Sequence, residues 1–402
     1  FSQAKKDVMY DLLKREDINW RSLNLQMAAK VHDIHALDSG ETRAFVLDDS
    51  IKTRRGKRME GVSSHFDHVS NISVMGHQVL TLGLSTEEAF LPLDSQISIS
   101  KVKAQPVNKQ FKDGRSAGAK RYDEAIGKTK VQIATGMLRR AVRHGIRAAY
   151  VVADAWFGNK AMMRAALEFN MTAILRMKKS KTKYRVPHGN GHKLLDAKEL
   201  YRRAVRKQWN PVSDLPWKAV EMIVEIDLAK DTDKGPRYHR IKLLFVRGIN
   251  DKPDHTASRK DWALFVSTDP DLSSVRMLQT YALRWSIEVY FKEAKQHLGF
   301  LQEQTQTFVS HTASIHLCAL RYLMLVDGKL VAEQSSVGQI RAQVQDQFDS
   351  LNYAARLWGV FRSIVAGTLR SLENKLKCNV EDVMSQIDQR VSKFLEQAQM
   401  LD

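Results

Sequence analysis

Two short apolar runs that end in aspartate constrain the fold of this chain more than any other feature. Residues 44–47 (AFVL) are followed by a DDS sequence that begins at Asp48, and residues 148–153 (AAYVVA) are followed by Asp154. Apolar runs of this length, bounded by polar residues, are typical of buried strands. The sequence therefore predicts two strands whose aspartates emerge at the same edge of one sheet.

The rest of the pattern predicts an α/β core that a β-rich segment interrupts. Further strands are expected at 74–84 and 172–177, with helices at 121–144 and 160–169, and this alternation is typical of α/β proteins. We expect five segments: an N-terminal helical region at 1–40, the first part of the core at 41–179, a β-rich insertion at 180–268, the second part of the core at 269–332 and a C-terminal helical region at 333–402. Because residue 1 is Phe rather than Met, we also expect the native start to precede it.

The net charge of +18 is concentrated in two stretches. Residues 101–147 hold 13 Lys/Arg against 3 Asp/Glu, and residues 176–207 hold 12 against 2. Such focused charge is typical of a surface that binds a polyanion. Tyr184, Tyr201 and Trp209 lie among the cations of the second stretch, which favours nucleic acid. Charge alone leaves DNA, RNA, an anionic membrane and an ordinary solvated surface open.

Several classes of protein are excluded by what the sequence lacks. No run of about 18 apolar residues is present, so we expect no transmembrane helix and no membrane partner. Cys318 and Cys378 lie too far apart for a disulfide framework or a cysteine zinc site. His65, His68 and His77 lack the spacing of zinc ligands. We expect a cytoplasmic protein.

A third acidic residue lies on a predicted helix over residues 281–300. At 100° per residue, one narrow sector of this helix holds Tyr281, Arg284, Glu288, Lys292 and Lys295, about a quarter-turn from an apolar stripe. An i,i+4 ladder of ion pairs along Arg284, Glu288 and Lys292 would explain the same pattern structurally. Taken with Asp48 and Asp154, however, Glu288 completes a set of carboxylates suited to Mg²⁺ or Mn²⁺, and a pair of such ions can promote phosphodiester cleavage.

The spacing Tyr-x2-Arg-x3-Glu-x6-Lys over 281–295 resembles the signature of DDE transposases in insertion-sequence family four and its bacterial relatives. LDDS at 47–50 and VVADAWFGN at 151–159 are similar to the family's two aspartate strands, and ILRMKKS at 174–180 is similar to the next strand. The similarity covers residues 1–330. It implies an RNase H-like fold in which two divalent ions, Mg²⁺ or Mn²⁺, are held by Asp48, Asp154 and Glu288.

The resemblance also implies how DNA is bound. The expected DNA-binding residues are Tyr281, Arg284, Lys292, Lys295, Arg176 and Trp156. The expected partner is double-stranded DNA, both the terminal inverted repeats of a transposon and the target, bound by a homodimer in the bacterial nucleoid. The aromatic residue that would stack on a flipped base stays open among Trp156, Phe157 and Trp209. Asp49 stays open as an alternative to Asp48, and we expect Arg54, Arg55, Lys57 and Arg58 to lie near the DNA.

Together these features predict a transposase of the cut-and-paste type, which cleaves the ends of its element and joins them to target DNA. Whether a hairpin intermediate forms is left open. Two other functions are compatible with the same sequence. One is an inactive, DNA-binding derivative of a mobile element, and the other is an RNase H-like nuclease that does not transpose.

Overall fold

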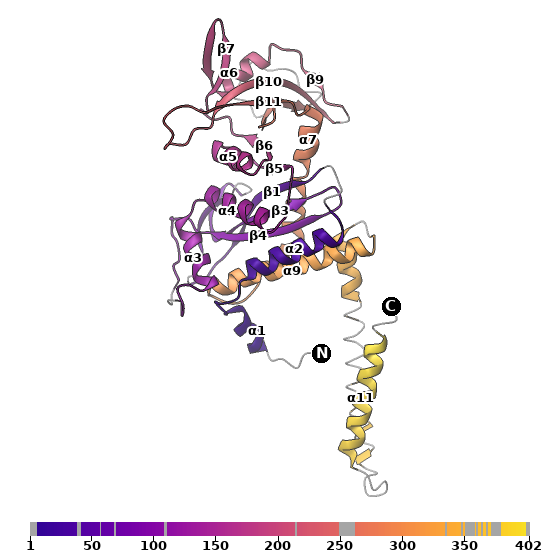
Figure 1. Ribbon diagram of the computed structural model, residues 1–402. Helices are drawn as coiled ribbons and strands as arrows, with labels where there is room; N and C mark the ends of the chain where they lie inside the picture. Colours follow the sequence, from indigo (N-terminus) through magenta and orange to yellow (C-terminus); the bar gives the residue numbers. More distant parts are fainter. Residues whose placement is uncertain are drawn as a thin grey trace. The chain divides into compact units, whose positions relative to one another are not determined.

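The computed structural model describes residues 6–37, 42–56, 58–67, 70–107, 111–213, 215–248, 262–333, 336–346 and 379–398, and a few positions between 349 and 370. The chain divides into two compact units, Phe1–Leu330 and Val331–Asp402, and each is described by itself. Figure 1 shows the elements of both units.

The centre of the first unit is a mixed sheet in the order β4-β3-β1-β5-β6. Its strands are β1 (Ala44–Thr53), β3 (Ile72–Ser85), β4 (Phe90–Ser98), β5 (Tyr150–Ala153) and β6 (Thr172–Met177). Strand β3 runs antiparallel to its two neighbours, β4 and β1, whereas β1, β5 and β6 run parallel to one another. This order and direction are those of an RNase H-like core, so the expected fold class is confirmed.

Helices cover both faces of this sheet. Successive residues of a strand point to opposite faces. Asp48 in β1 contacts Arg284 at the start of α8 (Trp285–Gln296), and Asp49 contacts Lys130 in α4 (Lys130–Arg143). It follows that α8 and α4 lie on opposite faces. The central strands are apolar on both faces for the same reason, and Val151, Val152 and Ala153 are fully buried.

The remaining helices of the core include α1 (Lys6–Leu13), α2 (Trp20–Ile34), α3 (Ala117–Gly127) and α5 (Lys160–Glu168). The helix predicted over 121–144 is two helices, because Thr129 forms a capping box that starts α4 after the end of α3. The helix predicted over 281–300 is also interrupted. It comprises the end of α7 (Ser274–Ala282) and the whole of α8, with Arg284 in the turn between them.

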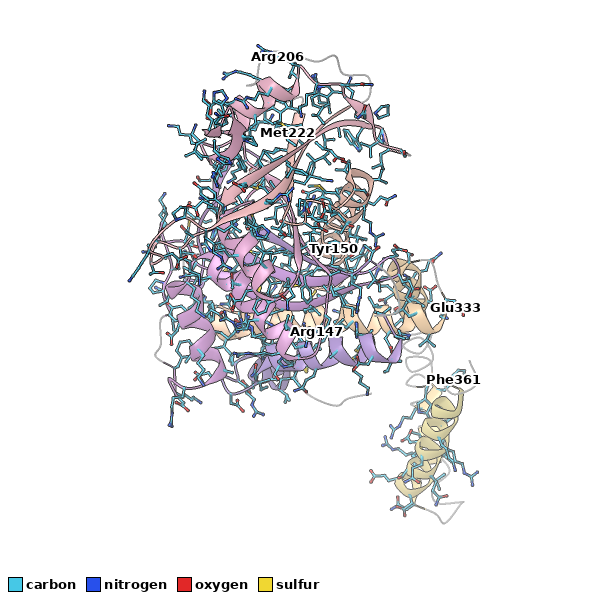
Figure 2. The ribbon with its side chains drawn as sticks, turned by 45° about the horizontal axis from the view of Figure 1, so that its top comes forward. Arg147, Tyr150, Arg206, Met222, Glu333 and Phe361 are labelled. Atoms are coloured by element: carbon cyan, nitrogen blue, oxygen red, sulfur yellow. The ribbon has the colours of Figure 1, made fainter. Side chains whose placement is uncertain are left out.

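The strands of the predicted insertion extend the core sheet instead of forming a sheet of their own. Strand β12 (Trp262–Ser267) pairs antiparallel with β6, and the described strands then continue through β11 (Tyr238–Gly248), β10 (Trp217–Asp227) and β7 (Tyr184–His188). The shorter elements are β2 (Ser63–Asp67), β8 (Gly191–Leu195), β9 (Asn210–Pro211) and α6 (Ala197–Ala204). Figure 2 shows Arg206, beyond α6, and Met222, in β10, above Tyr150 at the start of β5.

Helix α9 (Phe308–Val331) runs beside α2 along one side of the core (Figure 1), and His35 Nε2 lies 2.8 Å from Asp327 Oδ1 between them. Of the helices in the described part of the chain, α9 alone is long and apolar enough to cross a membrane, and 72% of its most apolar stretch is buried. This helix meets a criterion of length and mean hydropathy only, because Phe308–Val331 contains no unbroken run of about 18 apolar residues. The burial indicates a core helix.

A buried ionic cluster fastens three helices to β4. Asp94 is fully buried in β4 and accepts hydrogen bonds from Arg21 of α2 at 2.9 Å and Arg140 of α4 at 2.7 Å, while Arg121 of α3 lies 3.9 Å away. Burial alone would raise the pKa of Asp94, but the three guanidinium charges lower it to about 2. Two cations of the first basic stretch therefore lie in the core and not on a DNA-binding surface.

The second unit contains α11 (Val380–Ala398). Trp358 Nε1 donates a hydrogen bond of 3.2 Å to Asp388 Oδ1 in this helix. Most of the C-terminal helices predicted after residue 336 lie outside the described residues.

Candidate active site

Asp48 and Asp154 lie side by side where the parallel pairing of β1 and β5 ends. Leu47 pairs with Ala153 in the last register position of the two strands, so Asp154 follows the end of β5. The sequence predicts that the first strand ends at Asp48, but β1 continues through Asp48 to Thr53, because these residues still pair with β3. Burial, and then the charge of Asp154, raise the pKa of Asp48 to about 7. A buried carboxyl group that resists ionisation beside a second carboxylate marks a position where a cation would be stabilising.

Glu288 is connected to this pair through Arg284. Arg284 Nη1 donates a hydrogen bond of 2.9 Å to Asp48 Oδ2, and Arg284 Nη2 donates to Glu288 Oε1. Because Arg284 lies in the turn before α8, its guanidinium group reaches β1 while Glu288 follows one turn later on the same helix. The structure therefore brings the three predicted acids to one edge of the sheet, with a guanidinium group between two of them.

Asp49 lies on the opposite face of the sheet, and both of its carboxylate oxygens have partners. Gln78 Nε2 donates to Asp49 Oδ1 at 2.9 Å, and Lys130 Nζ donates to Asp49 Oδ2 at 2.6 Å. Asp49 shares no partner with Glu288. This geometry favours Asp48 over Asp49 as a ligand at the acidic edge.

Tyr281 and Arg176 lie beside the acids. The ring of Tyr281 packs edge-on against Phe265, with centroids 4.7 Å apart, and Phe265 pairs with Arg176 between β12 and β6. Burial raises the pKa of the Tyr281 phenol, whereas the charges of Arg284 and Arg176 lower it. Arg176 is exposed, so both residues border the site and Arg176 is open to a ligand.

The two lysines of α8 differ in their surroundings. Lys295 Nζ donates to the backbone oxygen of Ile51 at 3.3 Å, and burial, followed by the charge of Lys52, lowers the pKa of Lys295. Lys292 is exposed and forms no ion pair within the described part of the chain. The predicted ladder of ion pairs therefore stops at Glu288, which leaves Lys292 free for a ligand.

The structure separates the three aromatic candidates. Trp156 is 36% exposed. Its backbone N–H donates a hydrogen bond of 2.9 Å to Asp154 Oδ1, which places it at the acidic edge. Phe157 is buried beneath it, with ring centroids 4.8 Å apart. Trp209 instead packs against Tyr201 in the extension of the sheet. Of the three, Trp156 combines exposure with proximity to the acids.

Two further residues at the site are absent from the sequence-based predictions. Trp285 is 63% exposed and directly follows Arg284. The sequence could have indicated Trp285, because this tryptophan lies outside the apolar stripe of the predicted helix. Lys130 contacts both Asp49 and the ring of Trp156, and because it is distant from both in sequence, no local pattern indicates this contact.

Several predicted DNA contacts are buried instead. Arg54 donates to Glu303 at 2.6 Å, and only 9% of its side chain is exposed. Tyr184 and Tyr201 are fully buried, so two of the three aromatics assigned to the second basic stretch are core residues, whereas Trp209 is half-buried. His65 and His77 are buried. Lys57 and His68 lie outside the described residues.

The acidic edge has the donor chemistry of a divalent-cation site but not a preformed cage. Within the described residues, no group of three His, Cys, Asp or Glu side chains is arranged to hold a metal ion. Arg284 explains this, because it neutralises Asp48 and Glu288 at once. The carboxylates themselves fit Mg²⁺ or Mn²⁺. Burial, and then the charge of Asp154, keep the pKa of Asp48 raised in spite of Arg284.

Comparison with known proteins identifies one matching family. The family described as DDE superfamily endonuclease matches residues 2–222, more than half of the chain. No protein of curated function matches the sequence. Among solved structures, the NurA nuclease from Sulfolobus solfataricus aligns with a TM-score of 0.28 and 9% identity, covering 70% of this chain and 86% of the nuclease. The Drosophila P element transposase strand transfer complex aligns with a TM-score of 0.20 and 9% identity, covering 87% and 79%.

Proposed function

We propose that this chain, which belongs to the DDE superfamily endonucleases, is a DNA transposase that cleaves the ends of a mobile element and joins them to target DNA. One observation carries the proposal: Asp48 and Asp154 lie on adjacent parallel strands directly after their last paired residues, and Arg284 links Asp48 to Glu288 there. The order and origin of these acids agree with the transposase signature in the sequence.

The three carboxylates would hold the divalent ions on which enzymes of this superfamily depend. Two Mg²⁺ or Mn²⁺ ions bound there would activate the attacking oxygen and stabilise the leaving oxygen of the phosphodiester. Asp48 and Glu288 become available to such ions when Arg284 releases them. A DNA phosphate offers Arg284 an alternative anion, so binding of DNA and formation of the metal site favour each other.

The surrounding cations would hold the DNA backbone. Arg176 and Lys292 are exposed beside the acids, and Lys295 is close enough to Lys52 of β1 for the charge of Lys52 to lower its pKa. Each phosphate contact releases counterions, so affinity at these positions falls steeply with salt. In a cut-and-paste reaction, this surface would bind terminal inverted repeats first and target DNA later, with two copies of the chain holding two ends in the bacterial nucleoid.

The test is a cleavage assay with Mg²⁺ on a plasmid that carries the DNA flanking the gene of this chain. The unmodified protein is expected to cut at the element ends and to join them to a second DNA, and Asp154→Ala is expected to abolish both reactions. Asp271→Ala removes an exposed carboxylate away from the site and serves as the matched control, with full activity expected.

Each alternative gives its own result in this assay. Cleavage without end specificity or joining would indicate a nuclease that does not transpose. Binding without cleavage would indicate an inactive derivative. Equal cutting by Asp154→Ala would show that the proposed site is wrong.

A further inference from the structure

Asp154 begins a tight turn whose backbone holds one of its two carboxylate oxygens. The N–H groups of Trp156 and Phe157 both donate to Asp154 Oδ1, at 2.9 and 3.4 Å. Among the described residues, no donor is bonded to Asp154 Oδ2. Hydrogen bonds of this kind fix the orientation of a carboxylate and leave its other oxygen available to a cation. The orientation of Asp154 therefore depends on how firmly the turn is held.

The end of the turn is fixed to the core, whereas its middle is open to solvent. Phe157 is buried. The backbone at Gly158 packs so closely on β6 that a Cβ atom there would lie 2.1 Å from the backbone oxygen of Arg176. Trp156, by contrast, is 36% exposed. The contacts of its ring therefore decide whether its N–H stays on Asp154.

Lys130 contacts the ring of Trp156 from α4. Lys130 Nζ lies 4.1 Å from the centroid of the ring, within the range of a cation–π interaction. The ring of Phe157 meets the same indole edge-on, with centroids 4.8 Å apart. Lys130 is the first residue of α4, whose start is fixed by the capping box of Thr129, and only 15% of its side chain is exposed. The indole is thus held between the start of a helix and the core.

Asp49 and Gln78 hold Lys130 from the sheet. Asp49 Oδ2 accepts from Lys130 Nζ at 2.6 Å, and Asp49 Oδ1 accepts from Gln78 Nε2 at 2.9 Å. Gln78 is buried in β3. A chain of contacts therefore runs from the sheet through Asp49 and Lys130 to Trp156, and it ends at Asp154 Oδ1.

We infer that Lys130, anchored by Asp49, is a positioning residue for the carboxylate of Asp154, because it holds the ring of Trp156 and thereby keeps the N–H of Trp156 on Asp154 Oδ1. The inference rests on the proposed function, which makes Asp154 a ligand of divalent ions. A carboxylate that is already oriented binds such an ion more tightly than one that must be ordered first.

Positioning and plain charge predict opposite effects for the loss of Lys130. A lysine near the acids repels a divalent cation, so removing its charge would by itself raise the affinity for the ion. Loss of a residue that orients a ligand lowers the affinity instead. The sign of the change therefore distinguishes the two roles.

The test measures the affinity of the full chain for Mn²⁺ by electron paramagnetic resonance of free Mn²⁺. Lys130→Met is expected to weaken Mn²⁺ binding about tenfold, the effect of losing a group that orients a metal ligand. Lys130→Arg keeps a cation between Asp49 and the ring and is expected to restore the affinity. Lys128→Met is the matched control, because Lys128 precedes α4 and pairs with Glu124 at 3.4 Å. It removes the same charge and is expected to cause no loss of affinity.

A double-mutant cycle and hydrogen exchange separate positioning from a general loss of structure. Trp156→Ala is expected to weaken Mn²⁺ binding as well, and Lys130→Met should have no further effect in that background. Lys130→Met should also speed amide exchange in the turn at 154–158 and leave exchange in β5 unchanged. Melting temperatures in EDTA show whether each variant is folded. If Lys130→Met is not, Trp156→Ala takes its place, because it removes the ring without changing any charge.

The outcomes separate this inference from the proposed function. Unchanged or higher Mn²⁺ affinity of folded Lys130→Met overturns the inference, even if the chain cuts element ends and the transposase function stands. An equal loss of affinity for Lys130→Met with and without Trp156 also overturns it, because Lys130 would then act without the ring. Mn²⁺ affinity that depends on Lys130, in a chain that cuts no DNA, supports the inference and contradicts the proposed function.

Discussion

Replacing Asp48 by Asn is expected to stabilise the metal-free protein, and to do so more strongly as the pH rises. Asn has the shape of Asp, and its oxygen can still accept the hydrogen bond that Arg284 donates at 2.9 Å. Its amide group replaces the oxygen that accepts from the backbone N–H of Asp49 at 2.8 Å, and the loss of this bond costs the same at every pH. The pH-dependent part of the difference therefore reports the charge of the carboxylate. Active-site residues chosen for function often destabilise the fold in this way.

The magnitude follows from the pKa of Asp48, which burial and the charge of Asp154 raise from 3.8 to about 7. A raised pKa means that the folded protein binds this proton more tightly than the unfolded chain does. The resulting stability is complete below pH 3.8 and is lost as the pH rises through 7. The full loss is roughly 4 kcal/mol, of which roughly 2–3 kcal/mol falls between about pH 5 and pH 8.

The assay is urea unfolding in EDTA, followed by tryptophan fluorescence, because six of the seven tryptophans lie in the unit Phe1–Leu330. From about pH 5 to pH 8, the free energy of unfolding of Asp48→Asn should gain roughly 2–3 kcal/mol relative to the unmodified chain. A difference that stays constant or shrinks with pH refutes the reasoning. Mg²⁺ added at the higher pH should recover the stability of the unmodified chain and leave the variant unchanged.

Three further predictions concern other charges. Asp94→Asn removes the anion shared by three arginines and should lower the free energy of unfolding by about 3–5 kcal/mol. Because the pKa of Asp94 is lowered to about 2, the unmodified chain loses this stability only as the pH falls from 3.8 through 2. Urea titrations near neutral pH should therefore show a constant difference between the variant and the unmodified chain. Arg284→Gln removes the cation between Asp48 and Glu288 and should raise the affinity of the DNA-free protein for Mn²⁺ about tenfold. Electron paramagnetic resonance of free Mn²⁺ measures this affinity. An unchanged affinity would contradict competition between the guanidinium group and the metal ion. Lys295→Ala should weaken DNA binding and lower its salt slope by about 1, and an unchanged slope in filter binding would remove Lys295 from the DNA contact.

The parallel centre of the sheet could be predicted because its strands are apolar on both faces. Residues 44–47 and 151–153 are buried throughout, and such runs stand out from the polar sequence around them. The aspartates after them could be predicted for the same reason, since the first residue beyond a buried run is the first one free to be charged. Local sequence was therefore sufficient for two of the three acids.

Strand β4 could not be predicted, although every residue in it is buried. Its sequence, FLPLDSQIS, contains a proline and four polar residues, which is the composition of a loop. The polar groups are satisfied by partners distant in sequence. Asp94 meets arginines of α2, α3 and α4, and Gln96 donates to the backbone oxygen of Arg121 at 2.9 Å. No local pattern contains that information.

The interruption before α8 decided how the third acid meets the others. A continuous helix would place Arg284 and Glu288 on one face and explain them as a ladder of ion pairs. The turn at Leu283 and Arg284 instead lets the guanidinium group bond to Asp48 as well as Glu288. The spacing of the signature was thus visible in the sequence, but the position of its arginine between two acids depends on tertiary structure.

The alternation of a strand explains why two adjacent aspartates are not redundant. Asp48 points toward α8 and meets Arg284, while Asp49 points toward α4 and meets Lys130. A shift of one residue in the register of β1 would exchange the two faces, placing Asp49 beside Glu288 and leaving Lys130 without its anchor. Under the proposed function, that shift would damage metal binding. The two aspartates of the DDS sequence therefore have different tasks, because Asp48 lies at the acidic edge and Asp49 holds Lys130 at the start of α4.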